Sequence, residues 1–105
     1  MKLNIDDRFT KELPADPILD NSRRQVQKAC FSYVTPKKTE NPEILHISPE
    51  MLSALGLTEE DATSKQFLNV FTGNSVLPNT TPYAMCYGGH QFGNWAGQLG
   101  DGRAI

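Results

Sequence analysis

Charge is absent from one third of this chain. No Asp, Glu, Lys or Arg lies between Gln66 and Gly100, whereas twenty of the 22 charged residues fall within the first 65 positions. Gly, Asn, Gln and Thr are frequent in this run of 35 uncharged residues, which makes it too polar for a membrane span and too long for an ordinary core strand. We therefore expect backbone that packs inside a larger body or faces a ligand.

An excess of basic charge is also lacking. The chain has a formal net charge of -2 and a pI near 5.6, whereas proteins that bind DNA or RNA usually carry a basic patch or stripe. The first ten residues include Lys2, Asp6, Asp7 and Arg8 instead of the apolar run of a signal peptide, and no segment is apolar for long enough to span a membrane. We expect a cytoplasmic protein with no nucleic-acid or membrane partner.

Cysteine is scarce and the chain is short. Cys30 and Cys86 lie far apart and form no CxxC motif or Cys/His cluster, so neither a zinc site nor a disulfide framework is indicated. Two free, buried thiols are the expected state. A chain of 105 residues has room for one modest core, but not for a core plus an elaborate active site.

Turn residues and apolar spacing predict a series of short helices and strands. The clearest start is Ser48-Pro49-Glu50, which supplies a capping hydroxyl, a proline at the first helical position and an acid near the positive end of the helix dipole; Gly56 then ends the helix. The full set is an extended segment at 13–20, a helix from Asn21 or Ser22 to Lys28, a strand at 30–34, a helix at 51–55, a second short helix between Thr58 and Gly73, and strands at 83–87 and 102–105.

Six of the eight glycines lie between residues 87 and 105. Glycine permits positive φ, and it lets the backbone approach another group closely. We expect the first property to be used by Gly88 and Gly89, at the end of the predicted strand. The spacing of the later glycines matches neither GxGxxG nor the Walker motif, so spacing alone gives a weak signal for phosphate binding. The predicted order is strand, glycine-rich loop, strand.

Three residues near the end of the chain are candidate nucleotide contacts. If this stretch is extended, Gly100 and Gly102 lie on one face, which would leave a bare floor for a base, a ribose or a phosphate chain. Arg103 is the only cation after Lys65, and its forked guanidinium suits phosphate oxygens. Strict alternation would send Arg103 to the opposite face, so either the backbone turns there or the side chain reaches around the strand edge.

Simpler structural interpretations stay open for these residues. Gly100-Asp101-Gly102 can form a tight hairpin turn stabilised by the Asp101 side chain. Core or hairpin packing is the simpler expectation for Phe92 and Trp95. His90 has no neighbouring carboxylate or second histidine in the sequence, so a structural histidine is expected there. A solvated helix face is expected for the cations of the first predicted helix, namely Arg23, Arg24 and Lys28.

The segment from Tyr87 to Ala104, YGGHQFGNWAGQLGDGRA, closely resembles the signature of the selenoprotein O family of kinase-like protein adenylyltransferases. The resemblance covers most of the chain from Leu13 onward, and the block from GGHQFG to GDGRA is its specific part. Shorter similar pieces precede that block in the expected order: Leu13-Pro14, Ala29-Cys30-Phe31-Ser32, Asn41-Pro42, Leu55-Gly56-Leu57 and Phe71-Thr72-Gly73-Asn74.

The resemblance implies a kinase-like enzyme that uses ATP with Mg or Mn to transfer AMP to Ser, Thr or Tyr hydroxyls of other proteins. The nucleotide contacts that it implies in this chain are Gly100, Gly102 and Arg103. The family's catalytic and metal-binding residues would lie beyond Ile105, so no catalytic or metal ligand is expected here. The implied fold class is α+β: an N-terminal fragment with an extension at 1–82 and the incomplete start of a kinase-like nucleotide-binding lobe at 83–105.

Two other hypotheses remain. The chain could be a stand-alone, non-catalytic protein-interaction module whose glycine-rich hairpin binds a partner protein. It could also belong to a nucleotide-binding pseudoenzyme, in which the downstream acidic residues are missing.

Overall fold

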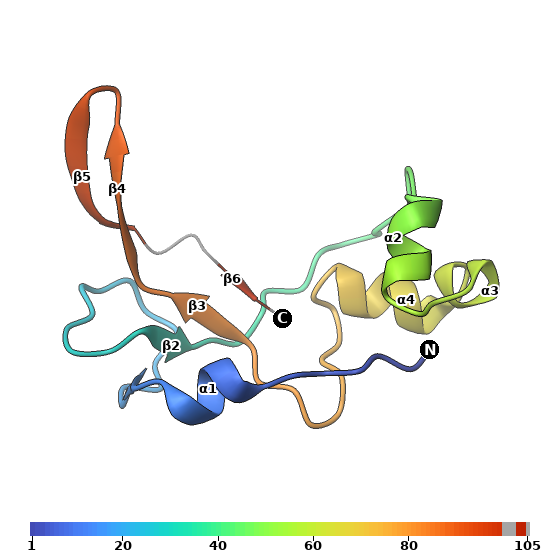
Figure 1. The fold of residues 1–105 in the computed structure, drawn as a ribbon, viewed down its shortest axis with the longest axis horizontal. Helices are drawn as coiled ribbons and strands as arrows, with labels where there is room; N and C mark the ends of the chain where they lie inside the picture. Colours follow the sequence, from blue (N-terminus) through green and yellow to red (C-terminus); the bar gives the residue numbers. More distant parts are fainter. Residues whose placement is uncertain (100–102, 105) are drawn as a thin grey trace. The chain divides into compact units, whose positions relative to one another are not determined.

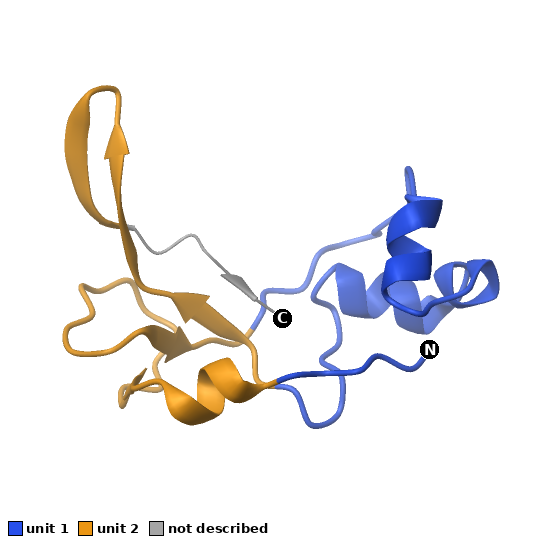
Figure 2. Cartoon of the chain, in the orientation of Figure 1, with its two compact units in different colours: residues 1–6, 36–80 blue, residues 7–35, 81–105 orange. Residues whose placement is uncertain are grey.

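The computed structural model describes residues 1–99, 103 and 104, with the last three of these described by their backbone (Figure 1). It is a small mixed α+β structure. Contacts divide the chain into two compact units, each built from two stretches of sequence (Figure 2). Unit 1 comprises residues 1–6 and 36–80, and unit 2 comprises residues 7–35 and 81–105.

The first helix of unit 1, α2 (Pro49–Ala54), is the helix predicted from its caps. The Ser48 hydroxyl accepts a hydrogen bond from the Met51 N–H at 3.2 Å, and Pro49 occupies the first turn, where no N–H is needed. After the helix, Gly56 has a φ of 69°. The N–H groups of Gly56 and Leu57 return to the carbonyls of Ser53 and Leu52, which is the Schellman arrangement that glycine favours at this position.

Two helices occupy the segment where the sequence predicted one: α3 (Glu59–Ala62) and α4 (Lys65–Phe71). Thr58 and Asp61 form a capping box at the start of α3. The Ser64 hydroxyl donates to the Asp61 carbonyl at 2.6 Å and accepts from the Phe67 N–H at 3.0 Å. Ser64 thereby ends one helix and begins the next, which is why the single predicted helix is wrong. Gly73 ends α4, as predicted, with a φ of 78°.

The core of unit 1 is small. Leu52, Leu57 and Ala62 are buried together, and the partly buried hydrophobic residues around them are Met1, Leu3, Ile47 and Phe67. Leu52 and Leu57 are also the two residues that flank the Schellman turn, so the turn and the core support each other.

Unit 2 contains a four-stranded sheet in the order β1-β2-β3-β6, with α1 (Arg8–Glu12) preceding it in sequence. Its strands are β1 (Ala15–Asp16), β2 (Phe31–Tyr33), β3 (Tyr83–Met85) and β6 (Arg103–Ala104). The β1–β2 pair is parallel and the other two pairs are antiparallel. Phe31 is fully buried, and its ring contacts the rings of Phe9, Tyr33 and Tyr83. The strands predicted at 30–34 and 83–87 are thus confirmed, but they are shorter than expected.

The glycine-rich segment forms a β-hairpin where a loop was predicted (Figure 1). Its strands are β4 (Tyr87–Gln91) and β5 (Asn94–Leu99). Phe92 and Gly93 form the turn with φ values of 51° and 80°, the left-handed conformations that a two-residue hairpin of type I′ requires. The expected positive φ at Gly88 and Gly89 is wrong, because among the described glycines the positive values belong to Gly56, Gly73, Gly93 and Gly97.

The predicted helix from Asn21 to Lys28 is also wrong, because this segment is an irregular loop. A helix needs its carbonyls for bonds to residues four positions later. Here the Asp20 and Ser22 carbonyls accept from the Arg24 side chain, and both backbone groups of Val26 bond to Gln98. Lys28 has a φ of 57°, outside the helical region. Bonds to side chains, from the nearby Arg24 and the distant Gln98, thus take the place of helical backbone bonds.

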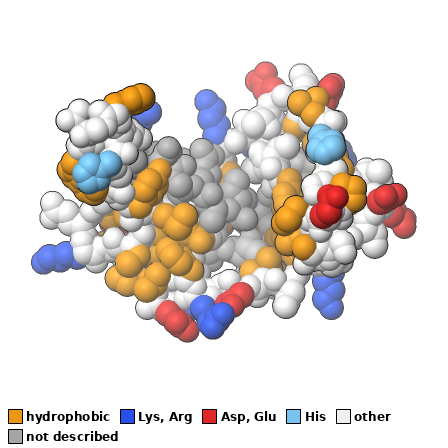
Figure 3. Space-filling model, turned by 45° about the horizontal axis from the view of Figure 1, so that its top comes forward, with side chains coloured by type: hydrophobic (Ala, Val, Ile, Leu, Met, Phe, Trp, Pro, Cys, Tyr) orange, Lys and Arg blue, Asp and Glu red, His pale blue; other side chains and the backbone are white. Residues whose placement is uncertain are grey.

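Hydrophobic side chains are exposed on the surface of each unit (Figure 3). In unit 1 the most exposed is Leu45, at 94%. A groove of about 530 Å³ in this unit is lined largely by apolar residues from the 43–48 segment, α2 and α4.

Candidate functional site

The predicted nucleotide contacts lie at the end of unit 2. Gly100 and Gly102 fall outside the described residues, as does the alternative turn at 100–102. The backbone of Arg103 lies in β6, where it is paired with Ala84 of β3. Arg103 therefore lies in the same sheet as β2, the strand that carries the buried Phe31.

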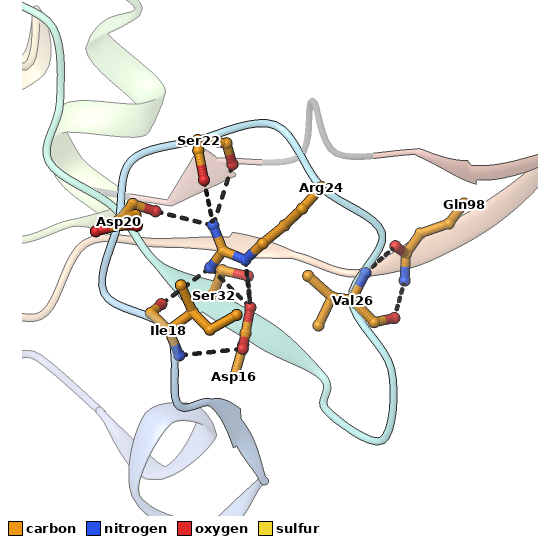
Figure 4. Close-up of polar contacts among 8 residues, drawn as sticks. All are labelled: Asp16, Ile18, Asp20, Ser22, Arg24, Val26, Ser32 and Gln98. Atoms are coloured by element: carbon orange, nitrogen blue, oxygen red, sulfur yellow. Dashed lines mark hydrogen bonds and ion pairs between the residues drawn. The ribbon is translucent and has the colours of Figure 1, made fainter.

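The side chain of Gln98 joins β5 to the irregular loop of unit 2 (Figure 4). Its Oε1 accepts from the Val26 N–H at 2.7 Å, and its Nε2 donates to the Val26 carbonyl at 2.7 Å. One amide side chain therefore satisfies both backbone groups of a residue 72 positions away. Gln98 itself is half-buried, and it is paired across the hairpin with Gly88. As a neutral side chain in the glycine-rich segment, Gln98 is expected to satisfy backbone groups of a loop, and it does so at Val26.

A buried ion pair organises the other end of the same loop (Figure 4). The Asp16 carboxylate is 6% exposed. Its Oδ2 atom lies 2.8 Å from Arg24 Nε and 2.7 Å from Arg24 Nη2, and its Oδ1 accepts from the Ile18 N–H at 3.1 Å. The pKa of Asp16 is lowered, first by the bond from the Ile18 N–H; burial opposes this, and the Arg24 guanidinium lowers the pKa further, because both donors favour the charged carboxylate.

Arg24 is therefore a structural residue, which corrects its expected place on a solvated helix face. Besides the pair with Asp16, its Nη1 donates to the Asp20 and Ser22 carbonyls at 2.8 and 3.1 Å, and its Nη2 donates to the Ile18 carbonyl at 2.9 Å. The guanidinium is saturated by these partners, so it has no free fork for a phosphate. No sequence signal marked this pairing, since the residues around Arg24 suggested a helix.

The hairpin carries an exposed aromatic pair. The rings of His90 and Trp95 meet edge to face with centroids 5.2 Å apart, and the Trp95 indole also lies over Gly88, where an added Cβ would overlap its ring atoms. Gly88 is thus required for close approach and not for positive φ. Hairpin packing is confirmed for Trp95. It is wrong for Phe92, whose side chain is fully exposed at the turn.

Both cysteines are free and half-buried, so the expected free thiols are confirmed, with less burial than predicted. The Cys86 N–H donates to the Cys30 carbonyl at 2.9 Å, which continues the β2–β3 pairing by one residue. Desolvation raises the pKa of the Cys86 thiol, which disfavours the reactive thiolate.

Within the described part of the chain, no group of three or more His, Cys, Asp or Glu side chains is placed to hold a metal ion. The helices described here are too short to cross a bilayer; even α4 has only seven residues.

Comparison with known proteins gives a consistent result. The family described as protein adenylyltransferase SelO matches residues 19–105. Curated proteins named protein nucleotidyltransferase YdiU align with 98% of the chain: the protein of Flavobacterium johnsoniae is 60% identical, and those of Methylobacillus flagellatus and Aromatoleum aromaticum are each 53% identical. The chain spans about a fifth of the length of each of these relatives.

This match covers most of the chain and includes the hairpin, β6 and the predicted nucleotide contacts. The chain therefore belongs to the protein adenylyltransferase SelO family, as the resemblance of its glycine-rich segment suggested.

Proposed function

We propose that the full-length protein is a cytoplasmic nucleotidyltransferase that transfers AMP from ATP to Ser, Thr or Tyr hydroxyls of protein substrates, with Mg or Mn as the metal. The observation that carries this proposal is the family match over residues 19–105. The names of the curated relatives support transfer of a nucleotide. Residues that would hold a metal ion belong, in this proposal, to the part of the relatives that this chain does not match.

In this proposal, Gly100, Gly102 and Arg103 contact the nucleotide in a kinase-like lobe that begins at residue 83 and follows an extension at 1–82. The β3–β6 pairing supports a strand at Arg103, and strands β1 and β2 of the preceding segment extend the same sheet. The backbone N–H groups of the glycine segment and one guanidinium would act as fixed donors that stabilise the negative charge of the phosphates. A bound metal would neutralise further phosphate charge.

The test is Arg103→Ala in the full-length protein. We expect at least about tenfold weaker ATP binding, because a charge-assisted hydrogen bond to phosphate is lost. Calorimetric titration of ATP with Mg measures the affinity, and transfer of labelled AMP to protein measures the activity. Arg23→Ala is the matched control, since Arg23 is exposed and lies outside the predicted contacts. Unchanged affinity and unchanged labelling in Arg103→Ala would contradict the proposal.

A further inference from the structure

The two cysteines lie opposite each other at one end of the β2–β3 pair. The two strands are antiparallel and Phe31 is paired with Met85, so the next position outward sets Cys30 against Cys86. The Cys86 N–H donates to the Cys30 carbonyl at 2.9 Å, and the Cys30 N–H donates to the Pro14 carbonyl at 2.8 Å. The backbone of Cys30 is therefore held on both sides by hydrogen bonds.

The thiols belong to the polar face of the sheet. Successive side chains of a strand point to opposite faces, and the aromatic cluster around Phe31 occupies one of them. On the other face, the Ser32 hydroxyl donates to Asp16 at 3.4 Å. Burial raises the pKa of the Cys86 thiol, a hydrogen bond with Ser32 opposes the rise, and the nearby Cys30 thiol adds to it. Both thiols therefore lie on the face of Ser32.

This arrangement has the dimensions that a disulfide needs. Residues directly opposite each other in an antiparallel pair have Cα atoms about 4.5 to 5.5 Å apart. Disulfides join residues whose Cα atoms are usually about 4.4 to 6.8 Å apart. Both cysteines are free and half-buried, so a small oxidant can reach them from solvent. Joining the two sulfur atoms requires rotation of the side chains and no movement of the strands.

We propose that Cys30 and Cys86 form a reversible disulfide site, which glutathione disulfide or a similar small disulfide closes and the corresponding thiol opens. The Cys30 thiolate attacks glutathione disulfide, whose S–S bond breaks, and one glutathione leaves as a thiolate. The Cys86 thiol then loses its proton and attacks the Cys30 sulfur of the mixed disulfide. This step forms the Cys30–Cys86 bond and releases the second glutathione. The two protons of the protein thiols end on the two glutathione molecules.

The disulfide links two parts of the chain that are far apart in sequence. Residues 36–80, which all belong to unit 1, lie between the two cysteines. A cross-link that closes so long a loop removes many conformations from the unfolded chain. Cys86 is also the single residue between β3 and β4, so the link fixes the point where the hairpin leaves the sheet. The oxidised protein should therefore unfold at a higher temperature than the reduced protein.

The experiment uses the full-length protein under native conditions. The protein is incubated with glutathione disulfide, its remaining thiols are blocked, and it is digested with trypsin without reduction. Cleavage after Lys and Arg places Cys30 in the peptide 29–37 and Cys86 in the peptide 66–103. We expect mass spectrometry to find these peptides joined, and to find them separate after treatment with dithiothreitol. Oxidation should raise Tm by at least about 2 °C.

Moving one cysteine by a single position gives the matched control. The double variant Met85→Cys with Cys86→Ser keeps two cysteines but places the second on the other face of the sheet, where its partner is Phe31. Met85 is exposed, so its replacement should be tolerated. We expect at least about tenfold less linked peptide from this variant, because its thiols are not held together. Cys86→Ser alone should give no linked peptide and no rise in Tm.

Three results would overturn the proposal. If the wild type forms only mixed disulfides with glutathione at Cys30 and Cys86, the two thiols do not meet in the folded protein. If the shifted variant gives as much linked peptide as the wild type, the link does not depend on the cross-strand position. If the wild type forms the link in urea but not under native conditions, the link belongs to the unfolded chain. The wild-type digest decides the question even if a variant does not fold.

Discussion

The two units hold their structure together by different kinds of contact. In unit 1, hydroxyl and carboxylate side chains bond to backbone groups three or four positions away: Ser48 to Met51, Thr58 to Asp61 and Ser64 to Phe67 are examples. The Asn74–Thr39 pair and the ion pair between the Met1 ammonium and Asp61 are longer-range exceptions. Most of the polar stabilisation of unit 1 is therefore local.

Unit 2 also has local contacts, such as those of Arg24 with the Asp20 and Ser22 carbonyls, but several of its side-chain contacts join distant parts of the sequence. Gln98 bonds to Val26 across 72 positions, Ser32 to Asp16 across 16 and Asn21 to Thr35 across 14. The sheet adds further pairs, since residues 36–80 of unit 1 lie between β2 and β3 in sequence. Closing such loops costs chain entropy before any contact forms. The stability of unit 2 therefore requires that its core and its long-range hydrogen bonds form together.

The difference matters for binding, because the predicted nucleotide contacts lie in the unit built from long-range pairs. In that unit, the side chain of Gln98 joins the end of β5 to the loop at Val26. A unit of locally capped helices offers no comparable attachment for the end of a hairpin.

The largest expected effect is that of Phe31→Ala. Phe31 is fully buried and contacts three other aromatic rings of unit 2, so its loss should cost about 3–5 kcal/mol. Hydrogen-exchange mass spectrometry of the full-length protein should show faster exchange in β1, β2 and β3, with unchanged protection of α2 and α4. Leu52→Ala, in the core of unit 1, is the reciprocal control. If Phe31→Ala lowered hydrogen-exchange protection equally in both units, the distinction between a unit stabilised by local contacts and one stabilised by long-range contacts would be wrong.

The same difference explains how much of the fold was predictable. The α2 helix was predicted because its start signals, Ser48 and Pro49, and its stop signal, Gly56, act on their immediate neighbours. Strands β2 and β3 were predicted because alternating side chains and nearby prolines are also local. Ser64 was missed because a serine inside a helical pattern is compatible with either continuation or a new cap.

Unit 2 was less predictable because its decisive contacts are made by side chains that no local pattern marks. Nothing near Arg24 indicates that its guanidinium will bond to Asp16 and three carbonyls, so a helix was predicted there. The turn at Phe92-Gly93 lacks the usual Asn-Gly or Asp-Gly sequence, so the hairpin was predicted as a loop. The family came from the resemblance of the glycine-rich segment. The site of Gly100, Gly102 and Arg103 came from that resemblance and from the chemistry of glycine and arginine, and it stays a prediction.

A smaller effect, dependent on pH, is expected at Asp16. Its pKa is lowered in the folded protein, so its charged form stabilises the fold above the pKa of the unfolded chain, roughly 3.9. That stabilisation is lost as the pH falls through the lower folded value. Asp16→Asn removes the charge opposite Arg24. We expect this variant to be less stable than the wild type at pH 6, with the difference shrinking below about pH 4.

Urea denaturation of the wild type and of Asp16→Asn at matched pH values measures this difference. Asp61 of unit 1 also has a lowered pKa, set first by its bond from the Thr58 N–H, and it is unchanged in the variant, so its contribution cancels. A difference that stays constant from pH 6 to pH 3 would show that the ion pair with Arg24 does not stabilise unit 2.

The smallest expected effect is that of Ser48→Ala in unit 1. The substitution removes the hydroxyl that accepts from the Met51 N–H and should cost about 1 kcal/mol. Because the bond spans only three positions, faster hydrogen exchange should be confined to the first turn of α2, with β2 and β3 unchanged. Ser48→Thr is the matched control, since threonine also caps helices. If Ser48→Ala altered exchange in β2 or β3 as much as in α2, the effect of this cap would extend beyond its own helix. The contrast between the two units would then be wrong.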